Sequence, residues 1–303
     1  MDKMPILNID GLSVSFAAYG KGAGKKELRV ISNLSINAHE GEILAVAGAS
    51  GSGKSLLAMA ILGILPRNAK AEGAISYKGK ALDEMLLRKL RGREIAFVPQ
   101  SVEYLDPMMR AGKQVSGDKS AVEKVFERYR LDKSVSGMFP FQLSGGMARR
   151  ILCATAVVGG ANLIIADEPT PGMSKELATR AMKHFRDLAN EGAAVMLITH
   201  DLSLALGYTD RVAIFYAGTT AEIAFASDFE CEDKLRHPYT KALWRAMPEN
   251  GFSPIPGSQP LAGKLHQGCL FEARCDIKTK ECIRGAIKPR VVRGGEVCCL
   301  YAT

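Results

Sequence analysis

The sequence predicts an α/β fold in which parallel strands alternate with helices. An apolar run at Ile43–Ala47 leads into a glycine-rich turn, and a helix pattern follows over Lys54–Leu65. Three further apolar runs have the length and composition of buried strands: Leu163–Ala166, Val195–Thr199 and Val212–Tyr216. A helix pattern over Lys175–Ala189 separates the first two of these runs. Strand, helix and strand in this order indicate a βαβ unit with parallel strands.

Two further strands are predicted ahead of this core. Residues Ile6–Phe16 alternate apolar and polar side chains, which is typical of a half-buried strand. A second strand pattern covers Arg29–Ile36, and the glycine- and lysine-rich stretch Gly20–Lys26 between them is predicted to be a hairpin loop. We therefore expect an antiparallel pair beside the parallel sheet.

Changes in composition along the chain predict the domain boundaries. From about residue 82 to residue 155 the pattern becomes one of charged helices, which predicts a helical insertion in the α/β core. After Tyr239 the sequence is rich in proline and glycine, as in a linker, and five of the seven cysteines then follow. We expect a main domain over residues 1–236, with its helical part at about 82–155, and a small extension over 237–303.

Composition excludes several classes of protein. Of the 303 residues, 47% are hydrophobic and 24% are charged, which is typical of a folded globular chain. The longest apolar stretch, Ile151–Ala166, contains two glycines and an asparagine, so a helix, a turn and a strand explain it better than a membrane span. The first residues lack the apolar segment of a signal peptide, and we expect a cytoplasmic chain with free cysteines. The formal charge of +8 is a modest surface excess, and no nucleic acid partner is expected.

The glycine-rich turn matches a phosphate-binding loop in full. Residues Gly48–Ser55 read G-x-x-x-x-G-K-S, and the loop lies between a predicted strand and a predicted helix, as the chemistry requires. Lys54 is expected to reach the β- and γ-phosphates of a nucleotide, and Ser55 to bind Mg²⁺. Backbone N–H groups of the other loop residues would surround the phosphates: Gly48, Ser50, Gly51, Ser52 and Gly53.

Two further motifs supply the remaining chemistry of a nucleotide hydrolase. The strand Leu163–Ala166 ends in Asp167, which can hold Mg²⁺, and Glu168, which can act as the general base for an attacking water. Much earlier, Ser144, Gly145 and Gly146 begin a helix pattern and offer a hydroxyl and backbone N–H groups to an anion. A second phosphate-binding helix start makes sense if two chains meet head to tail and each covers the ATP of the other.

These motifs and their order resemble those of the ABC ATPases over essentially the whole chain. The resemblance implies a RecA-like P-loop core with an antiparallel β subdomain and an inserted helical subdomain, and it implies ATP and Mg²⁺ as ligands. Gln100, after the strand Ile95–Val98, resembles the Q-loop glutamine near the Mg²⁺, and His200 resembles the switch histidine that contacts the γ-phosphate. Phe16 corresponds to the aromatic residue that stacks on adenine, and Tyr19 is a second candidate.

Two stretches resemble the ATPases of oligopeptide, dipeptide and nickel importers in particular. They are Ile95–Gln100 followed by Leu105–Pro107, and the series His237–Leu243, Pro256–Gly257 and Gly268–Cys275. The resemblance implies an ATPase that drives import of peptides or nickel complexes at the inner face of a membrane. It also implies a second, related ATPase subunit, two transmembrane permease subunits and an external substrate-binding protein as partners. Nothing in the sequence identifies the cargo.

In this group the cysteines of the extension can bind an iron–sulfur cluster. By their positions in the sequence, the residues that correspond to the cluster ligands are Cys269, Cys275, Cys282 and Cys299, with Cys298 as an alternative to Cys299. Four thiolates suit a [4Fe-4S] cluster or a structural zinc ion, and the absence of C-x2-C pairs favours the cluster. Buried cysteines without a metal are the remaining alternative.

The chain departs from the family pattern after Glu168. Relatives continue with Pro-Thr, two small residues, leucine and aspartate, whereas here the aspartate position holds Ser174. Serine still predicts a cap for the helix that begins near Lys175, but communication between the two ATP sites is put in doubt. Arg149 also stands where the group usually has glutamine. Two alternatives therefore stay open: a degenerate regulatory subunit, and an ABC ATPase that acts outside transport.

Overall fold

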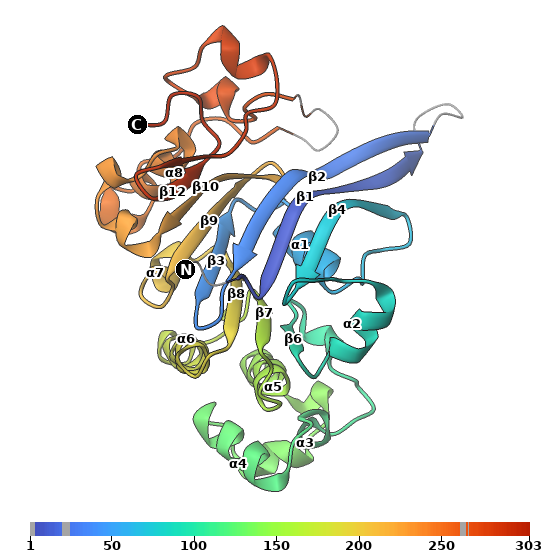
Figure 1. Ribbon diagram of the computed structural model, residues 1–303. Helices are drawn as coiled ribbons and strands as arrows, with labels where there is room; N and C mark the ends of the chain where they lie inside the picture. The colour runs from blue at the N-terminus through green and yellow to red at the C-terminus, as the bar shows by residue number, and fades with distance from the viewer. Residues whose placement is uncertain (1–3, 20–24, 261–264, 266) are drawn as a thin grey trace.

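The computed structural model describes residues 4–19, 25–260, 265 and 267–303 (Figure 1). Its largest element is an eight-stranded sheet. The strands follow one another across this sheet in the order β11 (Arg290–Val292), β12 (Gly295–Val297), β10 (Thr219–Phe225), β9 (Arg211–Tyr216), β3 (Ile43–Gly48), β8 (Ala194–Thr199), β7 (Leu163–Asp167) and β6 (Ile95–Val98).

The centre of this sheet is parallel, as the sequence predicts. β3 lies parallel to β8 and β9, and β7 lies parallel to β6 and β8. β10 turns back antiparallel to β9, and the hairpin of β11 and β12 continues the sheet beyond β10. β6 falls within the range 82–155 that the sequence assigns to the helical insertion, yet it is a strand of the core sheet.

The second sheet is antiparallel and has the order β2 (Lys25–Ala38), β1 (Leu7–Tyr19), β4 (Ala69–Tyr77) and β5 (Lys80–Ala81). The predicted pairing of the first two strands is confirmed. Of the predicted hairpin loop Gly20–Lys26, residues 20–24 lie outside the described residues, and the last two belong to β2.

Helices cover the parallel sheet and build the insertion. They are α1 (Lys54–Ile61), α2 (Glu84–Leu90), α3 (Ala111–Gln114), α4 (Lys119–Arg128), α5 (Gly145–Val157), α6 (Lys175–Asn190), α7 (Leu202–Leu206) and α8 (Pro238–Arg245). α1 ends earlier than the pattern over Lys54–Leu65 predicts, because Gly63 follows with φ near +61°, a left-handed conformation that stops the helix. Within the described residues, no helix combines the length and apolar character needed to cross a bilayer.

Alternating side chains of β3 form the two cores of the molecule. Ile43, Ala45 and Ala47 join an apolar cluster with α5 and α6, whereas Leu44 and Val46 join a second cluster with α1, β1 and β2. Because successive residues of a strand point to opposite faces, this one buried strand ties both layers to the sheet. The loop at its carboxyl end is therefore held from both sides.

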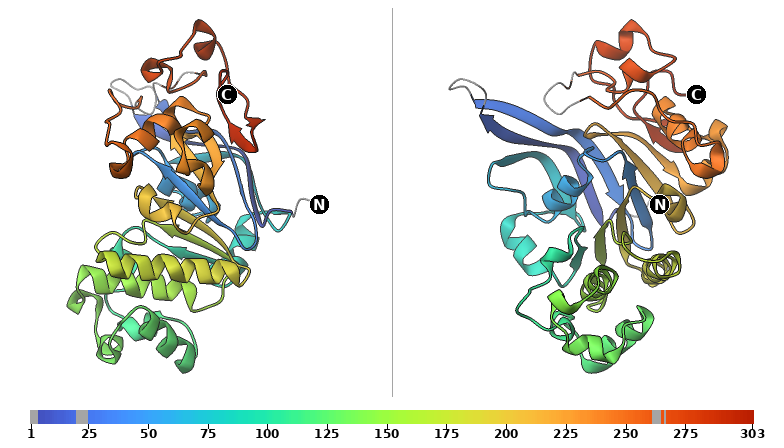
Figure 2. Two further views of the ribbon diagram at one scale, coloured as in Figure 1. Left: turned by 90° about the vertical axis from the view of Figure 1, so that its left-hand side faces the viewer. Right: turned by 180° about the vertical axis from the view of Figure 1, so that it is seen from behind.

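The helical insertion and the C-terminal extension lie at opposite ends of the molecule. In all three views α3 and α4 form one end, and the segment after α8 forms the other, with the parallel sheet between them (Figures 1 and 2).

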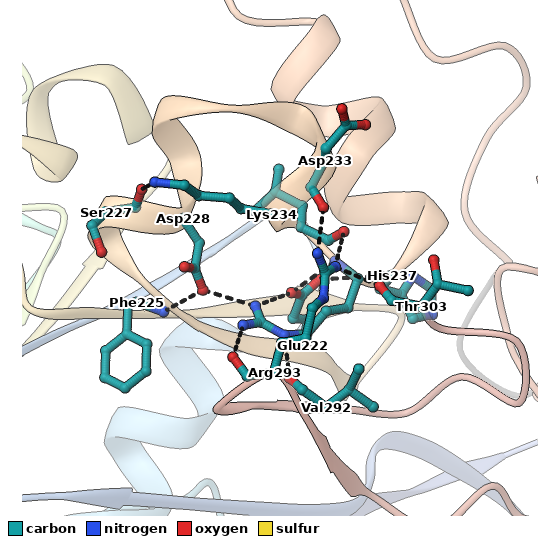
Figure 3. A network of polar contacts seen from close by, with 12 residues as sticks. Glu222, Phe225, Ser227, Asp228, Asp233, Lys234, His237, Val292, Arg293 and Thr303 are labelled. Carbon is teal, nitrogen blue, oxygen red and sulfur yellow. Dashed lines mark hydrogen bonds and ion pairs between the residues drawn. The ribbon is translucent and has the colours of Figure 1, made fainter.

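A buried polar network fastens the extension to β10 (Figure 3). The Glu222 carboxylate accepts hydrogen bonds from the backbone N–H groups of Arg236 and His237 and from Nη1 of Arg236. Arg236 also donates to Asp228 at 2.8 Å and to the backbone carbonyls of Val292 and Arg293. Both side chains of the central ion pair are buried, with exposed fractions of 0% for Glu222 and 1% for Arg236.

Candidate ATP-binding site

The phosphate loop connects β3 to α1. Gly53 precedes the helix with φ near +99°, and Gly51 has φ near +77°, so both positions use the left-handed backbone that glycine adopts without strain. Lys54 is 7% exposed, and its ammonium donates to the carbonyls of Gly48 at 2.8 Å and Ala49 at 3.0 Å. Burial lowers the pKa of Lys54, and the nearby carboxylates of Glu168 and Asp167 oppose that shift. The lysine charge is thus held in place inside the loop.

Asp167 and Ser55 meet at the end of β7. Asp167 is 3% exposed, and burial raises the pKa of its carboxyl although a hydrogen bond with Ser55 and the charge of Lys54 lower it. Among the described residues, Asp167 Oδ1 and the hydroxyl of Ser52 are buried without a hydrogen-bond partner. Buried polar atoms are normally satisfied, so these oxygens, together with Ser55, fit a Mg²⁺ ion and phosphate groups.

Glu168 and His200 form a pair across the ends of β7 and β8. Oε1 of Glu168 lies 2.8 Å from Nδ1 of His200, and the side chain of His200 is 64% exposed. Glu168 has φ near +49°. This backbone conformation is rare for a residue with a side chain, and it persists only where the surrounding structure enforces it. Its N–H donates to the carbonyl of Ile198, and its Oε2 is buried without a partner among the described residues. His200 thus orients one oxygen of the carboxylate, and the other oxygen makes no hydrogen bond within the described residues.

Within the ranges that the structure describes, the apolar Phe16 and the side chain of Gln100 make no hydrogen bond with this centre. Phe16 is half-buried on β1 and packs against the apolar cluster that contains α1, and the side chain of the alternative, Tyr19, lies outside the described residues. Gln100 is exposed after β6. The preceding carbonyl of Pro99 accepts a hydrogen bond from the buried Arg149 at 3.0 Å, which joins this loop to α5. The sequence marks Arg149 as a departure but does not predict that contact.

The turn of Ser144, Gly145 and Gly146 caps α5. The Ser144 hydroxyl accepts from the N–H of Met147 at 3.3 Å. A Cβ added to Gly146 would lie 3.0 Å from the carbonyl of Gly172, so the turn packs against the segment after Glu168 of its own chain. In the part of the chain that the structure describes, no hydrogen bond joins this turn to the phosphate loop, and both Ser144 and Gly145 are exposed.

The cysteines of the extension gather around one small cavity. Cys269, Cys275, Cys282 and Cys299 line a space of about 10 Å³, whereas Cys298 lines a different cavity against β10. Burial raises the pKa of the Cys269 thiol to about 12 and also raises the pKa of Cys275 and Cys299. Of the residues described, no three histidine, cysteine or acidic side chains are placed to hold one metal ion. As arranged here, the thiols form no finished zinc or iron–sulfur site.

Comparison with known families agrees with the site geometry. Residues 31–171 match the family model described as ABC transporter, and residues 222–282 match the model described as Oligopeptide/dipeptide transporter, C-terminal region. The second match begins on β10, ahead of the boundary at 236 that composition suggests, and it includes the strand to which the extension is fastened.

Named relatives give the same family, and a solved structure shares the fold. The chain is 32% identical to the dipeptide transport ATP-binding protein DppD of Bacillus subtilis, over 92% of this chain and 89% of the relative. It is 31% identical to the oligopeptide transport ATP-binding protein OppD of Escherichia coli, over 91% of this chain and 87% of the relative. The dimeric ATP-binding cassette MJ0796, solved with ADP and Pi, shares the fold with a TM-score of 0.65 and 24% identity, over 73% of this chain and 98% of that chain. This chain is therefore an ABC-type ATPase and belongs to the family of oligopeptide and dipeptide transporter ATP-binding proteins.

Proposed function

We propose that this chain hydrolyses ATP to drive a membrane importer of peptides. The observation that carries the proposal is the arrangement of Lys54, Asp167 and Glu168 around one loop, on a chain whose extension matches peptide-transporter ATPases. Ser55 and Asp167 would hold Mg²⁺, which neutralises phosphate charge when bound. Glu168 would take the proton of the attacking water, and His200 keeps the carboxylate oriented through the 2.8 Å contact.

Glu168→Gln tests the hydrolytic role. Glutamine keeps the shape of the side chain but cannot accept the proton, so ATP turnover of the assembled transporter should fall by about 10²- to 10⁴-fold, the range of general-base catalysis. Glu191→Gln, on an exposed site after α6, is the matched control and should keep full turnover. Unchanged turnover in Glu168→Gln would leave the chain as a nucleotide-binding regulatory subunit.

The second proposal is a pair of ATPase subunits with unequal sites. Support comes from the turn at Ser144, which is exposed and lies beside its own Gly172, where it is available to a partner chain. Ser174 caps α6 by accepting from the N–H of Leu177, so the fold accommodates serine at the position where aspartate is usual. Co-purification with a related ATPase subunit, and loss of turnover when Ser144 is changed in only one of the two, would support the unequal pair. A homodimer with full activity would contradict it.

The proposed complex also contains two permease subunits and an external substrate-binding protein, with this chain bound at the inner membrane face. Peptide is the favoured cargo because residues 222–282 match the oligopeptide and dipeptide transporter model and a relative is a dipeptide transport ATP-binding protein; nickel complexes are the alternative. Uptake of labelled oligopeptide and labelled nickel in a deletion strain separates them. Peptide uptake should be lost and should return with the wild-type chain but not with Glu168→Gln.

For the extension, we propose that an iron–sulfur cluster is assembled between Cys269, Cys275, Cys282 and Cys299. Support comes from the position of these four thiols around one cavity that Cys298 does not line. Iron and sulfide analysis of protein purified without oxygen should find both elements, and Cys299→Ser should lower them while Cys298→Ser should not. One equivalent of zinc without iron would contradict the cluster.

A further inference from the structure

The phosphate loop is contacted by a segment from outside the ATPase core. Gln259 lies 209 positions after Ser50, yet its Nε2 donates a hydrogen bond to the Ser50 carbonyl at 3.0 Å. A Cβ added to Gly51 would lie 3.5 Å from the same nitrogen, so the amide rests directly on the loop. No motif marks Gln259 in the sequence, because its partner is defined only by the fold.

This hydrogen bond satisfies the third of three consecutive carbonyls in the loop. The carbonyls of Gly48 and Ala49 accept from Lys54, and the next carbonyl, of Ser50, accepts from Gln259. A peptide unit is planar and trans, so its carbonyl and its N–H point in opposite directions. The hydrogen bond from Gln259 therefore fixes the N–H of Gly51 on the side of this peptide that faces away from Gln259, and N–H groups of such a loop bind phosphate.

The extension fixes the segment that carries Gln259. Arg274 donates to the carbonyls of Pro256 at 2.7 Å and Ile255 at 3.1 Å, and to the hydroxyl of Tyr216 at 3.1 Å. Gly257, with φ near +77°, packs beside the Arg274 side chain. Residues 255–260, which we name the strap, are thus held at one end by the extension and rest on the phosphate loop at the other.

A second contact joins the extension to the same loop. The hydroxyl of Tyr239 on α8 is hydrogen-bonded to the backbone of Ala49, and the ring packs against Tyr216 and Phe271. Tyr239 is almost fully buried, so this contact is part of the packed core. Two consecutive residues of the loop, Ala49 and Ser50, are therefore positioned by residues that follow the parallel sheet in the chain.

We propose that Gln259 is a positioning residue for the nucleotide and that the strap lets the C-terminal extension set the affinity of the phosphate loop for the phosphates of ATP. The proposal rests on ATP binding by this chain at Lys54. The only polar contact of the Gln259 side chain within the described residues is the one that its Nε2 makes with the phosphate loop, because its Oε1 is buried without a partner there.

Nucleotide binding to the purified full-length chain tests the role of Gln259. Calorimetric titration with Mg-ADP and Mg-ATP should give dissociation constants about three- to tenfold higher for Gln259→Met, which keeps the length of the side chain and removes the donor. Gln259→Glu should weaken binding further, because a carboxylate cannot donate to the Ser50 carbonyl and repels phosphate. Ser258→Ala, an exposed neighbour on the strap, is the control and should match wild type.

One further variant and an unfolding measurement separate the possible failures. Lys54→Ala should abolish binding, and undiminished binding there would overturn the ATP site itself. If Lys54→Ala does not bind nucleotide but Gln259→Met binds it with wild-type or higher affinity, only the positioning role of Gln259 would be overturned. The unfolding midpoint without nucleotide should be the same in Gln259→Met and wild type, and a lowered midpoint that accounts for the affinity loss would also overturn it.

A double-mutant cycle tests the strap. Arg274→Met should raise the dissociation constant, and the double variant with Gln259→Met should be no weaker than the weaker single variant, because both changes release the same segment. Additive losses, or no effect of Arg274→Met, would contradict transmission through the strap. If Arg274→Met does not fold, Ile255→Gly removes a side chain that packs the same end of the strap against the apolar core, and it should give the same pattern.

Discussion

The buried ion pair between Glu222 and Arg236 should be the most sensitive point in the attachment of the extension. Glu222→Ala removes a carboxylate that accepts from two backbone N–H groups and from the arginine. Removing one partner of a buried ion pair costs about 3–5 kcal/mol. Asp228 still accepts from Arg236 at 2.8 Å, which offsets part of the loss, but the backbone N–H groups of Arg236 and His237 are left without this acceptor. We therefore expect a loss of about 3–5 kcal/mol in the free energy of unfolding.

The only tryptophan of the chain provides the assay. Trp244 lies on α8, and its Nε1 donates to the carbonyl of Phe229 at 2.7 Å, so its fluorescence reports whether the extension is docked. Urea titration of Glu222→Ala should shift the fluorescence transition to lower urea. Glu232→Ala is the matched control, because Glu232 accepts from Arg245 at 2.9 Å in a more exposed pair and should cost no more than about 1 kcal/mol. Equal shifts in the two variants would refute the assignment of Glu222 as the main fastening.

Three other changes have definite expected outcomes. Burial lowers the pKa of His184 from 6.5 to about 4, so the unfolded chain takes up a proton at a higher pH than the folded chain does. The free energy of unfolding should therefore fall as the pH drops from 6.5 to 4. His184→Gln should make that decline shallower in urea titrations. Gly218→Ala places a Cβ 1.9 Å from the carbonyl of Val30 and should lower the thermal midpoint more than Gly192→Ala, which has a positive φ but open space. Ser174→Ala should lower the free energy of unfolding by about 1 kcal/mol, whereas Ser174→Asp should keep the wild-type value, because a hydroxyl or a carboxylate can cap α6 and a methyl group cannot. Equal stability of the Ala and Asp variants in denaturant titrations would disprove the cap.

The parallel core was predictable because its strands carry their own signal. β3, β7, β8 and β9 are apolar apart from Asp167, Thr199 and Arg211 at strand ends, as is typical of strands buried on both faces, and each begins or ends within two residues of the predicted run. β11 and β12 were missed, since each has three residues and exists only by pairing with a neighbour. Strands that short have no periodicity to detect.

The candidate site likewise has a part that the sequence predicts and a part that only the fold reveals. Gly48–Ser55 and the pair Asp167 and Glu168 follow from spacing, because adjacent residues at the end of a strand must share one edge of the sheet. The contact of Glu168 with His200 required the register of β7 with β8, and the contact of Gln259 with Ser50 required the path of the extension. Long-range neighbours of this kind are set by packing and leave no local pattern.

The hairpin of β11 and β12 gives the extension a protective role as well. β12 pairs with β10 through Glu222 with Val297 and Ile223 with Glu296, so it covers a row of backbone N–H and C=O groups on β10. A chain cut after residue 236 would uncover that row on a strand whose middle residues are buried, and an open strand of this kind invites pairing with another molecule. Chimeric versions of this ATPase should therefore replace β10 together with the extension. Versions that lack only the extension should self-associate along the exposed edge of β10.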